Sequence, residues 1–206
     1  SLIELVGRCK QRVALACFAS NVARMETIAA TAAANGRYVG LVGRSLWNIN
    51  RLAQECGYLA EAGNFLSEHD AAYLPRDQVV LAVTGSQGEA NAALARIAAG
   101  NHPEIELDPG DTVIFSSRVI PGNEKSIARI QNGLARRGIE IITEKDHFVH
   151  VSGHPARDEL AEMYGWVKPP VLVPIHGETR HLIEHERFAR EQKIPHTLVA
   201  ENGAMV

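Results

Sequence analysis

The chain has 206 residues, of which 46% are hydrophobic and 22% charged, a composition typical of a globular protein and not of a disordered or collagen-like one. Its 21 basic and 24 acidic residues give a net charge of -3, which does not fit a chain held to nucleic acid by bulk positive charge. Any contact with nucleic acid would therefore be local. Two small basic clusters, Arg8-Lys10-Arg12 and Arg136-Arg137, could make such a contact, but they are equally well interpreted as solvated faces.

The cysteines and the apolar runs indicate a compartment. Cys9, Cys17 and Cys56 have neither CxxC spacing nor an even number, which argues against a disulfide framework and favours a cytoplasmic, reducing location. No apolar run approaches the roughly 18 residues of a membrane helix and no signal peptide is present, so we expect no membrane partner. The chain opens at Ser1 inside a predicted helix without an initiator Met, which suggests a fragment.

Short apolar runs alternate with amphipathic stretches along the first two thirds of the chain, which predicts an α/β fold with a Rossmann-like parallel sheet flanked by helices. The predicted strands cover residues 12–18, 38–42, 78–83, 112–116 and 139–143. The predicted helices cover residues 21–34, 45–56, 89–99 and 123–137. Residues 58–77 carry Gly63 and Pro75 and are predicted to be mostly loop, with at most one short turn of helix or strand.

The sequence changes character after Glu144, where His147, His150 and His154 occur within eight positions. We therefore predict one domain over residues 1–146 and a second over residues 147–206. The predicted elements of the second domain are a helix over residues 158–164, a strand over 171–175, a long helix over 179–192 and a final strand over 197–199.

Four of the predicted strand-to-helix junctions are rich in small polar residues, and all four are expected to open on one edge of the sheet. They are residues 18–21 (FASN), 43–45 (GRS), 84–89 (TGSQGE) and 116–124 (SSRVIPGNE). A single junction of this kind is expected for helix caps and turns in any protein. Four together, including an Arg suited to phosphate, are as compatible with an anion-binding edge as with capping alone.

Two histidine segments are more specific. In residues 150–154 (HVSGH) a Ser-Gly turn would present His154 at the start of the next helix, and the apolar strand over residues 171–175 would carry His176 at its carboxyl end. Both positions are typical of catalytic groups. The remaining candidates, His69, His102, His181, His185 and His196, are interpreted as ordinary core or surface residues. His181 and His185 have the spacing of HExxH, but no third ligand accompanies them.

Six motifs resemble, in order and spacing, the β-CASP branch of the metallo-β-lactamase fold family, and within it the ribonuclease J enzymes. They are FASN followed by Arg24, GRS, TGSQGE, IPGNE, HVSGH and PIHGE. The resemblance covers nearly the whole chain. It implies a β-CASP domain over residues 1–146, followed over residues 147–206 by a partial metallo-β-lactamase αβ segment.

The resemblance also implies a function, that of a metal-dependent ribonuclease with 5′-3′ exonuclease and endonuclease activity in RNA processing and decay. It implies that His176 is a metal ligand and that His154 acts as a general acid or steadies the scissile phosphate. The residues implied to bind substrate are Ser20, Asn21, His150, Val151, Ser152, Gly153 and His154. For Arg44, Gln87 and Glu89 it implies only proximity to the RNA.

The chemistry agrees with these roles, because two divalent ions commonly activate water and neutralise the leaving oxygen in phosphodiester hydrolysis, and an uncoordinated imidazole can protonate that oxygen. The resemblance implies two Zn²⁺ ions in an intact site, with Mn²⁺ or Mg²⁺ as alternatives. The family's HxHxDH ligand segment does not occur in this sequence. We therefore expect this chain alone neither to bind zinc tightly nor to cleave RNA.

The expected partners are RNA with a 5′ monophosphate and, for the intact protein, further copies of itself. The second domain would leave an apolar face uncovered, which favours dimerisation or partial disorder of the isolated chain. Two alternatives stay open: a β-CASP nuclease acting on another nucleic acid, and a non-catalytic RNA-binding or scaffold module. A Rossmann-like small-molecule binder is disfavoured, because the glycine fingerprint and the ribose-binding acid are missing.

Overall fold

A computed structural model describes residues 1–151 and 153–204 of the chain. They form two compact units, unit 1 (Ser1–Val151) and unit 2 (Ser152–Val206). The domain boundary expected after residue 146 stays a prediction about the family's domains, while the compact units meet between residues 151 and 152. Among the described residues, no helix combines the length and the apolar character needed to cross a membrane.

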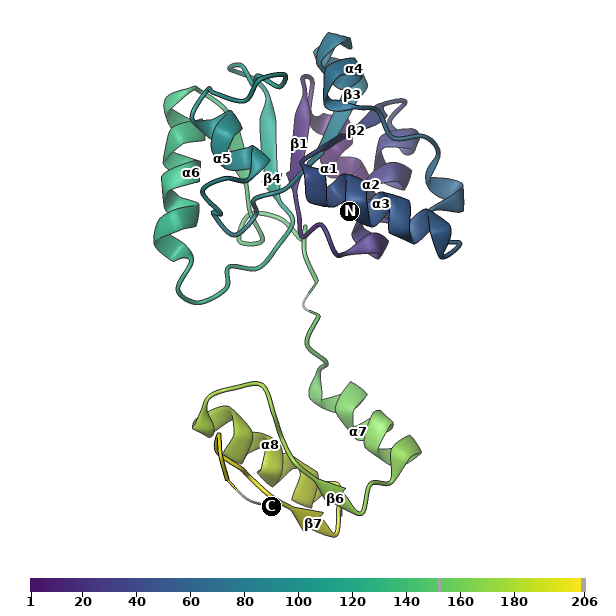
Figure 1. Cartoon of the computed structure of the whole chain (residues 1–206), viewed down its shortest axis with the longest axis vertical. Coiled ribbons are helices and arrows are strands. Elements are labelled where there is room, and N and C mark those ends of the chain that lie inside the picture. Colours follow the sequence, from purple (N-terminus) through teal and green to yellow (C-terminus); the bar gives the residue numbers. More distant parts are fainter. Residues whose placement is uncertain (152, 205–206) are drawn as a thin grey trace. The chain divides into compact units, whose positions relative to one another are not determined.

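Unit 1, all of whose residues are described, is built on a five-stranded sheet in the order β2-β3-β1-β4-β5 (Figure 1). The strands are β1 (Val13–Ala16), β2 (Tyr38–Val42), β3 (Val79–Val83), β4 (Thr112–Phe115) and β5 (Glu140–Ile142). Every pairing between neighbours is parallel. The predicted α/β class with a Rossmann-like parallel sheet is therefore confirmed.

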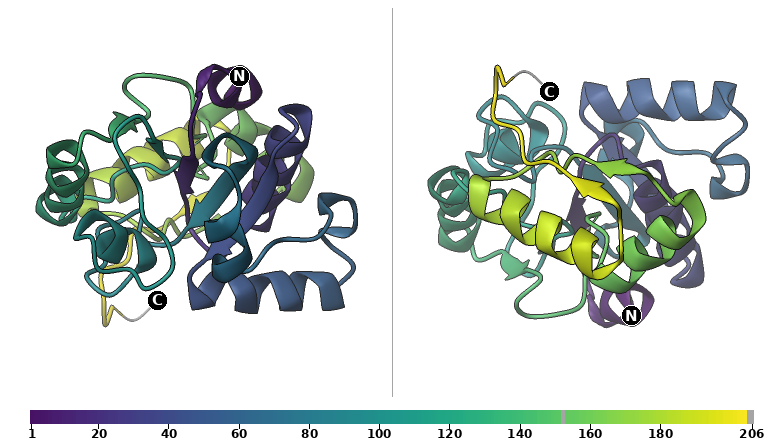
Figure 2. Two further views of the ribbon diagram at one scale, coloured as in Figure 1. Left: turned by 90° about the horizontal axis from the view of Figure 1, so that it is seen from above. Right: turned by 90° about the horizontal axis from the view of Figure 1, so that it is seen from below.

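Helices cover both faces of this sheet (Figures 1 and 2). One face carries α1 (Leu2–Arg8), α2 (Val22–Ala34) and α3 (Arg44–Glu55), and the other carries α4 (Glu68–Tyr73), α5 (Ala93–Ala98) and α6 (Glu124–Arg136). Successive residues of a strand point to opposite faces, so Val13 and Leu15 pack with the first group while Ala14 and Ala16 pack with the second. Burial on both faces explains why these strands appear in the sequence as unbroken apolar runs.

Two stretches of unit 1 differ from the prediction. Residues 58–77 contain η1 (Ala60–Ala62), α4 and η2 (Arg76–Gln78) rather than mostly loop. The helix α4 begins where the Ser67 hydroxyl accepts a hydrogen bond from the backbone N–H of Asp70 at 3.1 Å. Ser1 is not inside a helix but caps α1, because its hydroxyl accepts from the Glu4 N–H at 3.3 Å.

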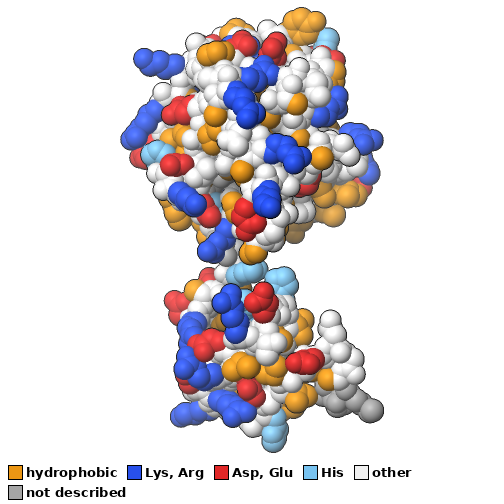
Figure 3. Space-filling view, turned by 90° about the vertical axis from the view of Figure 1, so that its left-hand side faces the viewer, with side chains coloured by type: hydrophobic (Ala, Val, Ile, Leu, Met, Phe, Trp, Pro, Cys, Tyr) orange, Lys and Arg blue, Asp and Glu red, His pale blue; other side chains and the backbone are white. Residues whose placement is uncertain are grey.

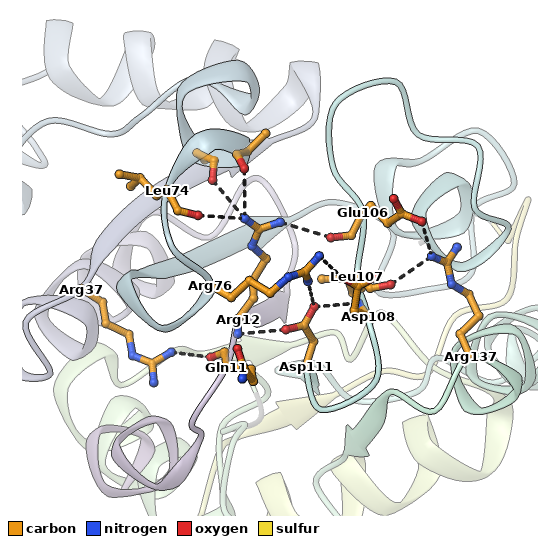
Figure 4. A network of polar contacts seen from close by, with 12 residues as sticks. Gln11, Arg12, Arg37, Leu74, Arg76, Glu106, Leu107, Asp108, Asp111 and Arg137 are labelled. Carbon is orange, nitrogen blue, oxygen red and sulfur yellow. Dashed lines mark hydrogen bonds and ion pairs between the residues drawn. The ribbon is translucent and has the colours of Figure 1, made fainter.

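At the amino edge of the sheet, Arg12 forms the centre of a buried polar network (Figure 4). Arg12 is 4% exposed, and its guanidinium donates to the carbonyl oxygens of Glu106, Ala71, Ala72 and Leu74. Its backbone N–H donates to Asp111 Oδ1 at 3.0 Å, and Arg76 pairs with the same carboxylate. The interpretation of Arg12 as part of a solvated basic face is therefore wrong: this residue closes the end of the sheet.

Unit 2 contains two helices beside a small parallel sheet within its described residues (Figure 2). The helices are α7 (Arg157–Val167) and α8 (Thr179–Glu191), and the strands are β6 (Val171–Leu172) and β7 (His196–Thr197). The two helices are joined by a hydrogen bond between the Tyr164 hydroxyl and His185 Nε2, and by the packing of Tyr164 near the Phe188 ring. The prediction that this part of the chain contains both helices and strands is therefore confirmed.

The strand predicted over residues 171–175 is shorter than expected, because β6 ends at Leu172. Pro174 lacks the N–H that a sheet ladder needs, and it lies directly in this run. Unit 2 also exposes large apolar side chains, among them Trp166 (74%) and Ile175 (78%). This uncovered surface agrees with the expectation, whereas dimerisation or disorder stays a prediction.

Candidate active site

The carboxyl edge of the unit 1 sheet collects the four polar junctions. Since all five strands run in parallel, the segments that follow β1, β2, β3 and β4 open on one edge. On the face drawn in Figure 3, Lys and Arg side chains are interspersed with Asp and Glu within each unit, so no large field of one sign covers that face.

At the first junction, Ser20 is exposed and Asn21 is the N-cap of α2. Asn21 Oδ1 accepts a hydrogen bond from the Arg24 N–H at 2.9 Å, so this oxygen already has a structural role. No acidic residue lies in the first turn of α2, which leaves the positive end of the helix dipole without an internal counter-charge there. RNA binding by Ser20 and Asn21 stays a prediction.

At the second junction, the chain supplies its own anion. The backbone N–H of Gly43 donates to Glu68 Oε1 at 2.8 Å, so a carboxylate occupies the start of α3. Arg44 lies nearby, exposed, in the wall of a cavity of about 610 Å³ that also contains Arg96 and His102. Burial lowers the pKa of His102, whose Nδ1 accepts from the Ile105 N–H at 3.1 Å. The carboxylate of Glu68 therefore already occupies the anion position next to Arg44.

Gln87 joins the third junction to the fourth. Its side chain is 5% exposed and its Nε2 donates to the Arg118 carbonyl oxygen at 2.9 Å and to Ser117 Oγ at 3.3 Å. Its Oε1 accepts from the Ile120 N–H at 3.0 Å and from Asn123 Nδ2 at 3.3 Å. These four bonds use the whole capacity of the amide. Gln87 therefore positions the IPGNE loop, a role that sequence reasoning missed.

Gly88 allows α6 to approach this junction. Its φ is +83°, and a Cβ at this position would meet the backbone carbon of Ser126 at 2.6 Å. Only glycine accepts both the left-handed backbone and the close contact. The Gln87 amide thus joins the TGSQGE and IPGNE motifs by hydrogen bonds, and the lack of a side chain at Gly88 leaves room for their close approach.

The HVSGH motif begins in unit 1. The Ser116 hydroxyl donates to the Val149 carbonyl oxygen at 2.7 Å, which joins the residue before the motif to the residue after β4. His150 is half-buried, its Nδ1 has no hydrogen-bond partner among the described residues, and burial, followed by the charge of Arg24, lowers its pKa. Val151 is 61% exposed. Ser152 lies outside the described residues, and Gly153 and His154 belong to unit 2.

Unit 2 brings His154 and His176 together. Their ring centroids are 5.4 Å apart and the ring planes lie at 74°. His154 precedes α7, and His176 lies in the loop between β6 and α8 with φ +66°, a left-handed conformation that is uncommon outside glycine. The sequence predicted His176 at the end of a strand, but in the structure it lies in a loop. Both rings line an open groove of about 780 Å³.

The same groove does not form a metal centre within this chain. Among the described residues, no three His, Cys, Asp or Glu side chains are placed to hold a metal ion. His185 is bonded to Tyr164, and His181 Nδ1 accepts from the Glu178 N–H at 3.1 Å, so the interpretation of these two as structural residues fits their contacts. The residues present therefore do not fit a two-metal site by themselves.

Two family models match the chain. Residues 10–134 match "Ribonuclease J, beta-CASP domain", and residues 138–199 match "Zn-dependent metallo-hydrolase RNA specificity domain". The second match begins before β5, which completes the sheet of unit 1, so the family division and the compact units differ.

Curated relatives match along the entire sequence. The chain is 46% identical to ribonuclease J of Sinorhizobium meliloti, covering 100% of this chain and 36% of the relative. It is 40% identical to ribonuclease J of Mycolicibacterium smegmatis, with 100% and 38% covered, and 36% identical to that of Thermus thermophilus, with 99% and 36% covered. The chain thus spans well under half the length of these relatives. The match over residues 10–134, more than half of the chain, shows that this chain belongs to the ribonuclease J family.

Proposed function

We propose that this chain is part of a metal-dependent ribonuclease with 5′-3′ exonuclease and endonuclease activity in RNA processing and decay. The observation that carries the proposal is the pair of imidazoles, His154 and His176, whose ring centroids lie 5.4 Å apart in an open groove. The family match supplies the reaction class, and the groove supplies a place for a phosphodiester.

In this proposal the two histidines have different roles. His176 is a metal ligand; its backbone is left-handed, and its ring lies beside that of His154. His154 donates a proton to the leaving 3′ oxygen or holds the scissile phosphate. Ser20 and Asn21 hold the RNA near its 5′ end, and the segment from His150 to His154 holds a substrate phosphate.

The metal requirement reaches beyond this chain. The family description names zinc, and we propose two Zn²⁺ ions, with Mn²⁺ or Mg²⁺ as alternatives. His176 would provide one ligand, and the remaining ligands would come from residues outside these 206. We accordingly propose that the isolated chain neither binds zinc tightly nor cleaves RNA.

Further properties complete the proposal. The substrate is RNA, preferably with a 5′ monophosphate, and the intact protein assembles as a homo-oligomer. The location is the cytoplasm, a proposal compatible with the absence of any disulfide among Cys9, Cys17 and Cys56. The β-CASP domain would cover residues 1–146 and the returning metallo-β-lactamase segment residues 147–206.

The test uses a longer protein that contains this chain, loaded with Zn²⁺ or Mn²⁺ and given a 5′-monophosphorylated RNA. His176→Ala is expected to abolish cleavage while RNA binding is retained, and His154→Ala to lower kcat more than it changes KM. His196→Ala, at an exposed histidine on β7, is the matched control and should cleave normally. A folded, metal-loaded protein that binds RNA without cleaving it would replace the enzyme with a non-catalytic RNA-binding module.

A further inference from the structure

We propose that a second cavity at the carboxyl edge of unit 1 binds a nucleobase. The cavity has a volume of about 500 Å³ and lies beyond the ends of β4 and β5, against α6. This volume falls in the usual range of small-molecule sites and exceeds what a single base needs. None of the family motifs' histidines lines it.

Apolar side chains form one part of the cavity wall. Phe115 and Ile127 are each 3% exposed and belong to the core on the α6 side of the sheet, so their positions are fixed by packing. Val119 is 40% exposed and also lines the cavity. Phe115 and Ile127 therefore support the wall from within, and Val119 is the exposed apolar side chain against which one face of a heterocyclic base would pack.

Hydroxyl groups form the inner polar part. Ser86 is 2% exposed, and its Oγ has no hydrogen-bond partner among the described residues. A buried hydroxyl without a partner is unfavourable, and an N–H or a carbonyl on the edge of a base would satisfy it. Ser117, 5% exposed, is held in place by Gln87, which donates to its Oγ at 3.3 Å. The cavity lining thus includes two buried serines, and the hydroxyl of one of them, Ser86, has no partner among the described residues.

The charges around the cavity favour a base over a phosphate. Glu124 and Glu144 line it together with Lys145, so carboxylates outnumber the cation. Glu124 Oε2 accepts from the Gly122 N–H at 2.8 Å and helps to shape the loop, which leaves the exposed Glu144 to accept from N–H groups of a ligand. A free phosphate would meet repulsion here, whereas the N–H edge of a base would find an acceptor.

The inference deepens the proposed function and rests on it in one respect, since an RNA substrate is the natural source of a base. The base could belong to a bound RNA chain or to a free nucleoside monophosphate released by cleavage. Both present the same heterocycle. Binding to the isolated chain needs no metal and no cleavage, so failure of this inference and failure of the proposed ribonuclease activity can be told apart.

The test titrates the 206-residue chain with guanosine 5′-monophosphate, with a short single-stranded RNA and with ribose 5-phosphate, and follows the methyl signals of Ile127 and Val119 by NMR. The nucleotide or the RNA is expected to shift these signals, and ribose 5-phosphate is not. Shifts with RNA alone would identify a base within a chain as the ligand. Equal shifts with ribose 5-phosphate, or none with any probe, would overturn the proposal.

Ser86→Ala is expected to weaken the binding about fivefold, the loss of one neutral hydrogen bond, without lowering the thermal stability. Its matched control is Ser45→Ala, at an exposed serine of a neighbouring junction that lines a different cavity. Unchanged affinity in Ser86→Ala, or an equal loss in Ser45→Ala, would count against the site. Val119→Trp, at an exposed position in the cavity wall, should block binding in a protein that still folds.

Discussion

The sheet of unit 1 is covered by helices on both faces, and its strands are almost completely buried. Unit 2 differs: of its described residues, the buried hydrophobic ones are Phe188, Ala189 and Ile194, while Val171 and Ile175 are exposed. The histidines that we assign to chemistry nevertheless lie in unit 2. This chain thus separates its buried framework from the histidines to which we assign chemistry, and we expect a further surface to cover the exposed apolar side chains of unit 2.

The largest expected effect tests the framework. Arg12→Ala removes a buried guanidinium and leaves the carbonyl oxygens of Ala71, Leu74 and Glu106 without this donor. We expect unit 1 to lose about 3–5 kcal/mol of its free energy of unfolding. Urea unfolding followed by the fluorescence of Trp47, which lies in unit 1, measures this loss.

The control keeps the comparison clean. Trp166→Phe in the background leaves Trp47 as the single tryptophan, so unit 2 does not contribute to the signal. Arg51→Ala breaks an exposed pair with Glu55 on α3 and should cost at most about 0.5 kcal/mol. A similar cost for both arginines would mean that the buried network does not hold the sheet.

A smaller effect is expected at the carboxyl edge. Gly88→Ala places a Cβ against the backbone of Ser126 and forces alanine into a left-handed backbone conformation. We therefore expect the free energy of unfolding of unit 1, measured by thermal unfolding, to fall by about 2–4 kcal/mol. Gly122→Ala has a similar positive φ but nothing within 4 Å of the added atom, and it should cost only about 1–2 kcal/mol. Equal losses would show that the close approach of α6 contributes nothing.

The smallest effect concerns pH. Burial lowers the pKa of His102 in the folded state, with Arg96 acting in the same direction and Glu68 and Glu104 opposing it. The unfolded chain therefore binds the proton more readily, so this contribution to stability is present above about pH 6.5 and is lost as the pH falls through the lower folded pKa. His102→Asn keeps an acceptor for the Ile105 N–H and should flatten the fall in stability of unit 1 between neutral and acid pH. An unchanged pH slope in the variant would refute this assignment.

Much of unit 1 could be predicted from the sequence, because strands buried on both faces leave apolar runs that local patterns reveal. The short helix α4 was not predicted, because six residues are too few to show helical periodicity. Ser67 followed by Asp70 was nevertheless a capping signal in the sequence. Pro174 was likewise a signal against the longer strand in unit 2. The pairing of His154 with His176 could be anticipated only through the family motifs.

The buried polar groups could not be predicted. Arg12 and Gln87 are bound by residues far along the chain, and nothing in their neighbouring sequence indicates burial. Arg and Gln side chains are mostly exposed in proteins, so the residue type alone predicts exposure at both positions. Tertiary contacts therefore determined their roles, and these roles are positional rather than catalytic.

Zinc titration of the isolated 206-residue chain tests the central claim most directly, namely that His176 is one ligand of a metal site that this chain holds only in part. We predict no saturable binding in the micromolar range or tighter, because one imidazole ligand with a second imidazole beside it does not hold a dinuclear centre. Stoichiometric tight binding that is lost in His176→Ala would contradict the account.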